Sequence, residues 1–248
     1  MFNVSFQYYN QDGTMIHNGL DRFSIRANSE FNIGRLSIGE NFAISREQNH
    51  GNMGNQDEQS VIGQIIKMQP IIPVYDIDGC FAGAKANTLG NGSNPVAAAY
   101  KRKDNTGTYN RVLGNFYASL EIIDGLKLKS SFGVNVTSSL YKGFNFPTPE
   151  NSEPTMVWSL DEDYNTSLEW TWTNTLNYVK TFGNNHNINA LLGYEAIDSK
   201  RNWLNAGMAG FVSTDQAAWY ISDALGDPST KTVYSYGNLW SLTFSSES

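Results

Sequence analysis

The chain has 248 residues, with 17 lysines and arginines against 24 aspartates and glutamates, so its formal net charge is −7. An acidic chain lacks the basic patch that replaces counterions on nucleic acid, so we expect no nucleic-acid partner. The single cysteine, Cys80, argues against a disulfide scaffold and a cysteine-rich zinc site. Charged residues are only 17% and aromatic residues 13%, a balance that indicates an all-β protein and also fits a transmembrane β-barrel.

Neither a leader nor a membrane helix is predicted. The chain begins Met1-Phe2-Asn3, without the basic n-region and apolar h-region of a signal peptide. No run approaches the roughly 18 apolar residues that a membrane helix needs. We therefore expect either a cytosolic chain or a piece of a longer protein.

Alternation of apolar and polar residues predicts eight strands. In the first, Phe2, Val4 and Phe6 alternate with Asn3 and Ser5, the pattern of a strand with one apolar face. Several strands reach about 12 residues, above the usual mode of about 5–6 and near the roughly 9–11 of a tilted membrane strand. The predicted strands cover residues 2–9, 20–29, 34–46, 111–122, 126–138, 168–181, 187–199 and 232–244.

Short and long connections alternate along the chain. The short ones contain turn residues such as Asp124-Gly125, which supply a positive φ and local side-chain bonds. An outer-membrane barrel has short periplasmic turns and long outer loops, whereas a soluble sandwich has no reason to gather its long loops at one end. The predicted long outer loops are 47–110, 139–167 and 200–231, with a shorter one at 10–19.

Residues 47–110 are too many for a structureless loop in a compact domain. The apolar stretch 61–68 follows Asp57 and Glu58, which predicts a short helix with acidic residues in its first turn, and Pro70 and Pro73 end it. We expect this loop to be partly ordered and to fold over a pore or onto a partner.

Three aromatic residues on one face of the strand 168–181 are predicted to lie at the membrane interfaces. Trp170 and Trp172 are placed near the outer interface and Tyr178 near the inner one, because their separation of roughly 20 Å in height fits the band between aromatic girdles. The alternative is that these side chains form the core of a sandwich.

A second group of aromatic residues falls in the predicted loop 139–167. Exposed aromatic side chains stack on sugars or anchor protein partners, so this group is a candidate substrate- or partner-binding site. The alternative is that the loop packs on itself. The candidates are Tyr141, Phe144, Phe146 and Trp158.

No catalytic, metal or cofactor site is predicted. The run 161–163 (DED) is read as solvated loop charge rather than a calcium site, and 76–79 (DIDG) as a loop motif. The three histidines are dispersed. A glycosidase pair drawn from Glu121, Glu169 or Glu195 is the alternative, but these residues fall on the polar face of predicted strands, so a lumen-lining role is simpler.

Six segments, in this order and spacing, resemble the barrel region of the SusC/RagA family of TonB-linked outer-membrane proteins. They are 68–79 (MQPIIPVYDIDG), 94–97 (NPVA), 111–118 (RVLGNFYA), 125–133 (GLKLKSSFG), 172–178 (WTNTLNY) and 186–195 (HNINALLGYE). The resemblance implies an outer-membrane transporter of Bacteroidetes-type bacteria that imports oligosaccharides or peptides. It also implies energy from the TonB complex, a SusD-like surface lipoprotein over the pore, and a large plugged barrel.

The chain departs from that family in lacking a signal peptide, a TonB-contacting segment and a plug, and it stops at a serine-rich tail, 245–248. We therefore interpret 1–248 as a partial barrel domain of about eight strands in an open curved sheet. Such a fragment is not expected to transport alone, because the unpaired edges of an open sheet cannot be satisfied by lipid. The remaining alternatives are a soluble or secreted β-sandwich that binds carbohydrate and a β-rich glycosidase.

Overall fold

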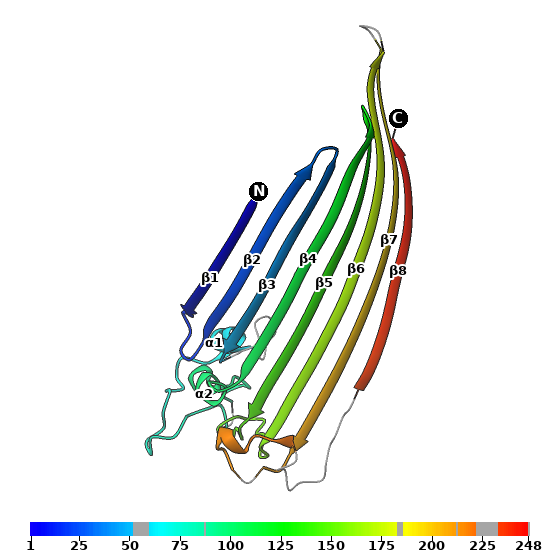
Figure 1. Ribbon diagram of the computed structural model, residues 1–248. Helices are drawn as coiled ribbons and strands as arrows, with labels where there is room; N and C mark the ends of the chain where they lie inside the picture. Colours follow the sequence, from blue (N-terminus) through cyan, green and yellow to red (C-terminus); the bar gives the residue numbers. More distant parts are fainter. Residues whose placement is uncertain (52–59, 87, 183–185, 212, 222–232, 248) are drawn as a thin grey trace.

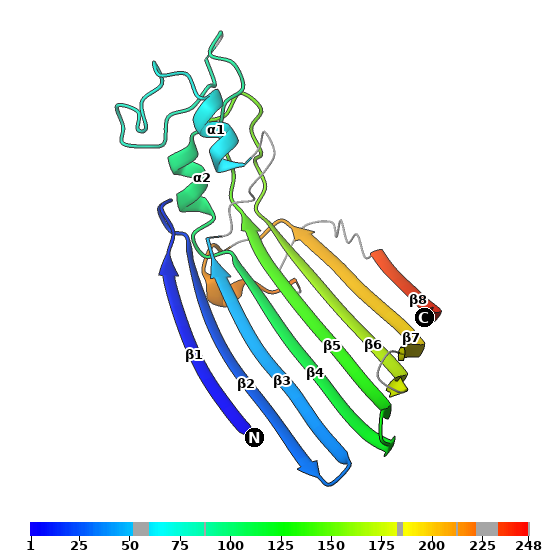
Figure 2. The same ribbon diagram turned by 90° about the horizontal axis from the view of Figure 1, so that it is seen from above.

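The computed structural model describes residues 1–51, 60–86, 88–182, 186–211, 213–221 and 233–247. Eight strands form a single antiparallel sheet in the order β1-β2-β3-β4-β5-β6-β7-β8, and the sheet is curved (Figures 1 and 2). The strands are β1 (Phe2–Asp12), β2 (Gly19–Ile33), β3 (Leu36–His50), β4 (Thr106–Ile123), β5 (Leu126–Asn145), β6 (Ser159–Phe182), β7 (His186–Ala209) and β8 (Val233–Glu247).

The predicted topology is confirmed, and the sandwich alternative is wrong for the described part of the chain. Every strand pairs with its sequence neighbour, and β1 and β8 lie at opposite edges of the sheet. A sandwich needs a second sheet packed on the first. The described strands make one layer, so its two faces remain open.

The strands are longer than predicted, and the loop bounds need correction. β6 and β7 each have 24 residues, and β5 has 20. Residues 139–145, 159–167 and 200–209, which were expected in loops, continue the ladder toward the end where the long connections lie. The apolar–polar alternation weakens there, but backbone hydrogen bonds between neighbours hold the strands regardless of side-chain type.

The described short turns, 34–35 and 124–125, lie at one end of the sheet, and the connections from β1 to β2, from β3 to β4 and from β5 to β6 lie at the other (Figure 1). We call these the turn end and the loop end. At the turn end, Gly125 has φ of 88°, and a Cβ there would meet the Val179 carbonyl oxygen at 2.3 Å. This left-handed conformation is open to glycine and strained for other residues, as the Asp-Gly signal predicts. Arg35 of one turn pairs with Asp124 of the next at 2.8 Å.

The long connection between β3 and β4 carries two short helices, α1 (Val61–Lys67) and α2 (Pro95–Lys101). The predicted helix is confirmed as α1, but its cap is Ser60, whose hydroxyl oxygen accepts from the Gly63 amide at 3.0 Å. Its first turn carries no acidic residue, and Asp57 and Glu58 lie outside the described residues. None of the described helices is long and apolar enough to cross a membrane.

The helix α2 was not predicted. The side-chain oxygen of Asn94 accepts from the amides of Val96 and Ala97 at 3.0 and 3.1 Å, and Pro95 occupies the first helical turn. An asparagine cap followed by proline is a recognised helix start, because proline has no amide hydrogen to leave unsatisfied there.

Candidate functional site

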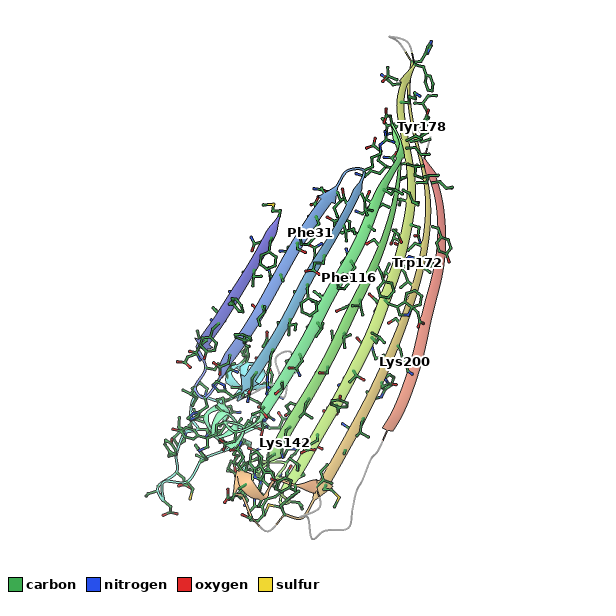
Figure 3. The ribbon with its side chains drawn as sticks, in the orientation of Figure 1. Phe31, Phe116, Lys142, Trp172, Tyr178 and Lys200 are labelled. Carbon is green, nitrogen blue, oxygen red and sulfur yellow. The ribbon has the colours of Figure 1, made fainter. Side chains whose placement is uncertain are left out.

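One face of the sheet is apolar and exposed. Residues paired across strands share a face, and the register aligns Phe116 of β4 with Phe132 of β5 and Trp172 of β6. Phe116 is 53% exposed and Phe31 of β2 is 60% exposed, and Figure 3 shows both on the body of the sheet. Soluble monomers rarely expose apolar patches that extend over a whole sheet, and such patches mark surfaces that meet an apolar medium or a partner.

One row of aligned apolar residues crosses this face toward the loop end. The register aligns Ile44 of β3 with Val112 of β4, Val136 of β5 and Leu168 of β6. On β7 the residue in the same row is Lys200. The apolar face is therefore continuous across β3 to β6 at this level of the sheet.

The three predicted interface aromatics lie together on this apolar face of β6. Trp172 donates from Nε1 to the Ser130 hydroxyl at 3.1 Å and meets Tyr194 edge-on, with ring centroids 6.0 Å apart. Trp170 stacks on Phe132 at 6.1 Å. Tyr178 lies toward the turn end (Figure 3). Their depth in a membrane stays a prediction.

The opposite face is polar and carries its own network. Arg22 donates to Glu47 at 2.5 Å, and the Thr137 and Ser167 hydroxyls lie 2.8 Å apart in a hydrogen bond. The Thr173 hydroxyl donates to Glu195 at 2.9 Å. Alternation along each strand therefore separates an apolar surface from a hydrogen-bonding one, as in a barrel with a polar lumen.

The register does not support a glycosidase pair. Glu121 aligns with Lys127 at the turn end, whereas Glu169 aligns with Asn135, eight residues further along β5. Glu195 lies four residues along β7 from the partner of Glu169. Both separations place the Cα atoms roughly 14 Å or more apart, so the side chains would have to lean several Å toward each other to reach the roughly 5–9.5 Å between the carboxyl groups of such pairs.

At the loop end, the candidate aromatic group is split. Phe144 is fully buried with Leu160, Phe211 and Trp219, and Phe146 and Trp158 pack against that cluster. Tyr141 is an odd-numbered residue of β5, so its side chain lies on the polar face, away from Phe144. The burial of Phe144 fits the alternative that the loop packs on itself. A fully buried ring is not accessible to a ligand.

Trp219 is the residue that sequence reasoning missed. It belongs to a short 3₁₀ segment (Gln216–Ala218) and its cap, in the connection after β7. Its ring stacks on Phe144, and its carbonyl accepts from Lys142 Nζ at 2.6 Å. In the sequence, Trp219 is an isolated tryptophan in a predicted loop. Nothing near it in the sequence indicates that it packs against Phe144.

The acidic run 161–163 lies in β6 rather than in a loop, and each member has a partner. Asn145 donates to Asp161 at 2.7 Å, Lys142 pairs with Glu162 at 3.3 Å, and Asn205 donates to Asp163. Within the described ranges, no group of three or more His, Cys, Asp or Glu residues is arranged to hold a metal ion. The run therefore stabilises the strand ends.

The segment before β4 is organised by buried asparagines. Besides capping α2, Asn94 donates from Nδ2 to the carbonyls of Val74 and Ala82, both at 2.8 Å. Between them, Asp76 accepts from the amides of Asp78 and Cys80, so the DIDG motif is a self-closed turn. One buried side chain thus ties the loop motif 74–82 to α2.

Asn105 fixes the same segment to the sheet. It is 1% exposed; its side-chain oxygen accepts from the Phe144 amide at 2.9 Å, and its carbonyl accepts from the Gly51 amide at 2.9 Å. The connection between β3 and β4 is therefore held against the ends of β3 and β5. Its predicted partial order is confirmed for the described residues.

A polar pocket of about 390 Å³ lies between α2, the end of β5 and the connection 146–158. Lys101 crosses it, donating to the Pro147 carbonyl at 2.8 Å and pairing with the nearly buried Glu150 at 2.5 Å. Asn151 lines the pocket, and its buried Oδ1 has no hydrogen-bond partner among the residues that the structure describes. The pocket offers donors and acceptors suited to hydroxyl- or amide-rich ligands.

The helix α1 carries a small exposed apolar patch. Ile62, Ile65 and Ile66 share one side of this short helix through their spacing, and they are 49%, 55% and 80% exposed. We call these three residues the isoleucine patch.

Known proteins similar in sequence are TonB-dependent receptors, although no protein-family model matches the chain. TonB-dependent receptor P3 of Formosa agariphila is 29% identical over 226 residues, covering 86% of this chain and 22% of the receptor. TonB-dependent receptor P26 of the same organism is 24% identical over 198 residues, covering 77% of this chain and 19% of the receptor. The chain spans about a fifth of these relatives.

Known structures agree in fold. The RagAB peptide transporter matches with a TM-score of 0.78 and 22% identity, covering 99% of this chain and 28% of that one. BauA, the ferric preacinetobactin receptor of Acinetobacter baumannii, matches with a TM-score of 0.53 and 12% identity, covering 33% of its chain. In sequence and in fold, the chain is therefore similar to part of the β-barrel of a SusC/RagA-type TonB-dependent receptor.

Proposed function

We propose that the chain forms part of the barrel of an outer-membrane transporter that takes up large nutrients, either oligosaccharides or peptides. The observation that carries this proposal is the separation of the sheet into an exposed apolar face and a hydrogen-bonded polar face. Similarity to TonB-dependent receptors supports it.

The proposed environment of the apolar face is outer-membrane lipid, with the loop end outward and the turn end toward the periplasm. The test uses the tryptophans of that face. The chain, refolded into vesicles with brominated acyl chains, should lose most of its tryptophan fluorescence, and Trp172→Phe should reduce the quenchable fraction. A Trp219→Phe control at the loop end should instead raise that fraction, because it removes a tryptophan that the lipid does not reach. Equal tryptophan fluorescence in brominated and unbrominated vesicles would contradict the proposal.

The chain by itself is proposed not to transport. β1 and β8 each present one edge of backbone groups without a partner strand among the described residues. Lipid offers no hydrogen bonds to such edges, which cost several kcal/mol per group. Expression of this chain in cells that lack the whole transporter should therefore give no growth on its nutrient, and recovered growth would overturn this point.

A SusD-like surface lipoprotein is the proposed partner at the loop end, and the TonB complex is proposed to supply energy to the whole transporter. The isoleucine patch fits the first contact because it is apolar, exposed and carried by an ordered segment. Ile65→Asp with Ile66→Asp should abolish co-purification with a co-expressed SusD-like lipoprotein. Ile33→Asp, an equally apolar position at the turn end, should leave co-purification intact.

The polar pocket at Lys101 is the proposed contact for the nutrient, because its donors and acceptors suit sugar hydroxyls and peptide amides alike. Tyr141, Phe146 and Trp158 remain proposed contacts beside it.

The absence of catalysis stays a prediction. Incubation of the purified chain with oligosaccharides and peptides should leave them uncut. Cleavage activity that stays with the chain through purification would contradict this prediction.

A further inference from the structure

A second hollow lies on the polar face, halfway along the sheet and apart from the loop-end pocket. It has a volume of about 440 Å³ and is lined by β4, β5, β6 and β7. Its floor is the hydrogen-bonded pair of hydroxyls from Thr137 and Ser167. Its lining residues are Tyr109, Asn110, Arg111, Thr137, Ser138, Ser139, Asn165, Thr166, Ser167 and Arg201.

The two charged residues of this hollow are both arginines. Arg111 aligns with Thr137, Thr137 with Ser167, and Ser167 with Arg201, so the arginines flank the hydroxyl floor on one row of the register. Three strand spacings of about 4.8 Å separate their backbones by roughly 14 Å. No carboxylate lines the hollow, although the chain as a whole has a net charge of −7.

Neither arginine is neutralised within the described part of the chain. Arg111 donates from Nε to the Asn135 side-chain oxygen at 3.2 Å, a neutral partner that leaves its other donors available. Arg22, on the same face nearer β1, instead pairs with Glu47 at 2.5 Å. On the polar face, Arg22 is thus paired with a carboxylate, whereas Arg111 and Arg201 line the hollow without one.

We propose that this hollow binds carboxylate groups of an anionic oligomer, with Arg111 and Arg201 as the cationic contacts and the Thr137 and Ser167 hydroxyls between them. Guanidinium groups bind carboxylates through charge-assisted, bidentate hydrogen bonds, and hydroxyls add neutral ones. The proposal rests on the proposed function in placing the polar face in the lumen. It deepens that function by making the nutrient acidic.

The test measures binding by the full chain refolded in detergent. The probes are a galacturonic acid trimer and a glutamate trimer, each compared with its neutral counterpart, a galactose trimer and a glutamine trimer. At least one acidic trimer should bind about tenfold more tightly than its neutral counterpart, and the preference should weaken as salt is raised. The sugar and peptide arms show which backbone carries the carboxylate.

Three variants separate charge from folding. Arg111→Gln with Arg201→Gln should abolish the preference for the acidic trimer, whereas Arg111→Lys with Arg201→Lys should keep part of it because the charges remain. Arg26→Gln, on the polar face of β2 outside the hollow, should leave it unchanged. Equal affinity of the wild type for acidic and neutral trimers would overturn the proposal, as would full preference in the glutamine double variant.

The same assay distinguishes this proposal from the proposed function. If the refolded chain fails to enter vesicles but keeps the arginine-dependent preference, the membrane assignment fails and the anion site stands. If the chain enters vesicles and shows no preference between acidic and neutral trimers, the anion site fails alone.

Discussion

The rings of Phe144 and Trp219 stack with centroids 4.5 Å apart and planes at 10°, joining the end of β5 to the connection after β7. Both rings are buried, and Phe211 meets Phe144 edge-on at 5.3 Å. This contact fixes a long connection onto the loop end of the sheet. It therefore sets the shape of the loop end.

Trp219→Ala should release that connection. Truncation of a buried tryptophan removes apolar burial and leaves a cavity, at a cost of about 3–5 kcal/mol. We expect faster hydrogen exchange and proteolysis across 211–221, with the strand amides unaffected. Tyr220→Ala, at the exposed neighbouring position, loses only the contact of its ring with Lys142 Nζ and should change both measurements far less. Unchanged exchange in Trp219→Ala would contradict the role given to the stack.

Asn94 performs two tasks that substitutions can separate. Asn94→Asp keeps the oxygen that caps α2 but loses the donors to Val74 and Ala82, so the loop 74–82 should loosen while α2 stays protected from exchange. Asn94→Ala should loosen both, at a cost of about 1–2 kcal/mol for the cap alone. Equal protection patterns in the two variants would show that the donor contacts do not matter.

The Lys101–Glu150 pair should show strong coupling. Glu150 is only 8% exposed in its side chain, so Lys101→Met leaves a carboxylate with little water and no cation, and we expect a loss of about 3 kcal/mol. Glu150→Gln in the same chain should restore most of that loss, since the uncompensated charge is removed. Urea unfolding of the two single variants and the double variant measures the coupling. Additive losses would contradict it.

An arginine introduced on the apolar face of β4 should hinder insertion into vesicles, whereas one on the polar face should not. Phe116→Arg places a charge on the apolar face and should cost about 2–4 kcal/mol if that position lies near the middle of the bilayer. Leu113→Arg makes a similar change on the polar face and should insert normally. Gel-shift assays of folding into vesicles report the difference, and equal insertion of the two variants would contradict the assignment of faces.

The strands and their order were predictable because each strand carries one apolar and one polar face, which imposes alternation on its residues. The alternation weakens beyond Leu140 in β5, where Lys142 shares the apolar face but contacts the carbonyl of Trp219. Sequence reasoning placed a loop there. The backbone ladder continues because pairing with β4 and β6 does not depend on side-chain polarity.

The loop end was less predictable because it depends on contacts between distant connections. Asn94-Pro95 was a readable helix start that was overlooked, whereas nothing local linked Trp219 to Phe144. The hollow lined by Arg111 and Arg201 could not be predicted for the same reason. These two arginines lie on strands far apart in the sequence, and only the registers of the four strands bring them to the same row.

The open edges at β1 and β8 have a consequence for the size of any pore. In a closed barrel the diameter grows with the number of strands, so that number sets the width of the lumen. Eight such strands closed on themselves would be filled by their own side chains, so a lumen that passes an oligomer requires this sheet to be one sector of a wider ring.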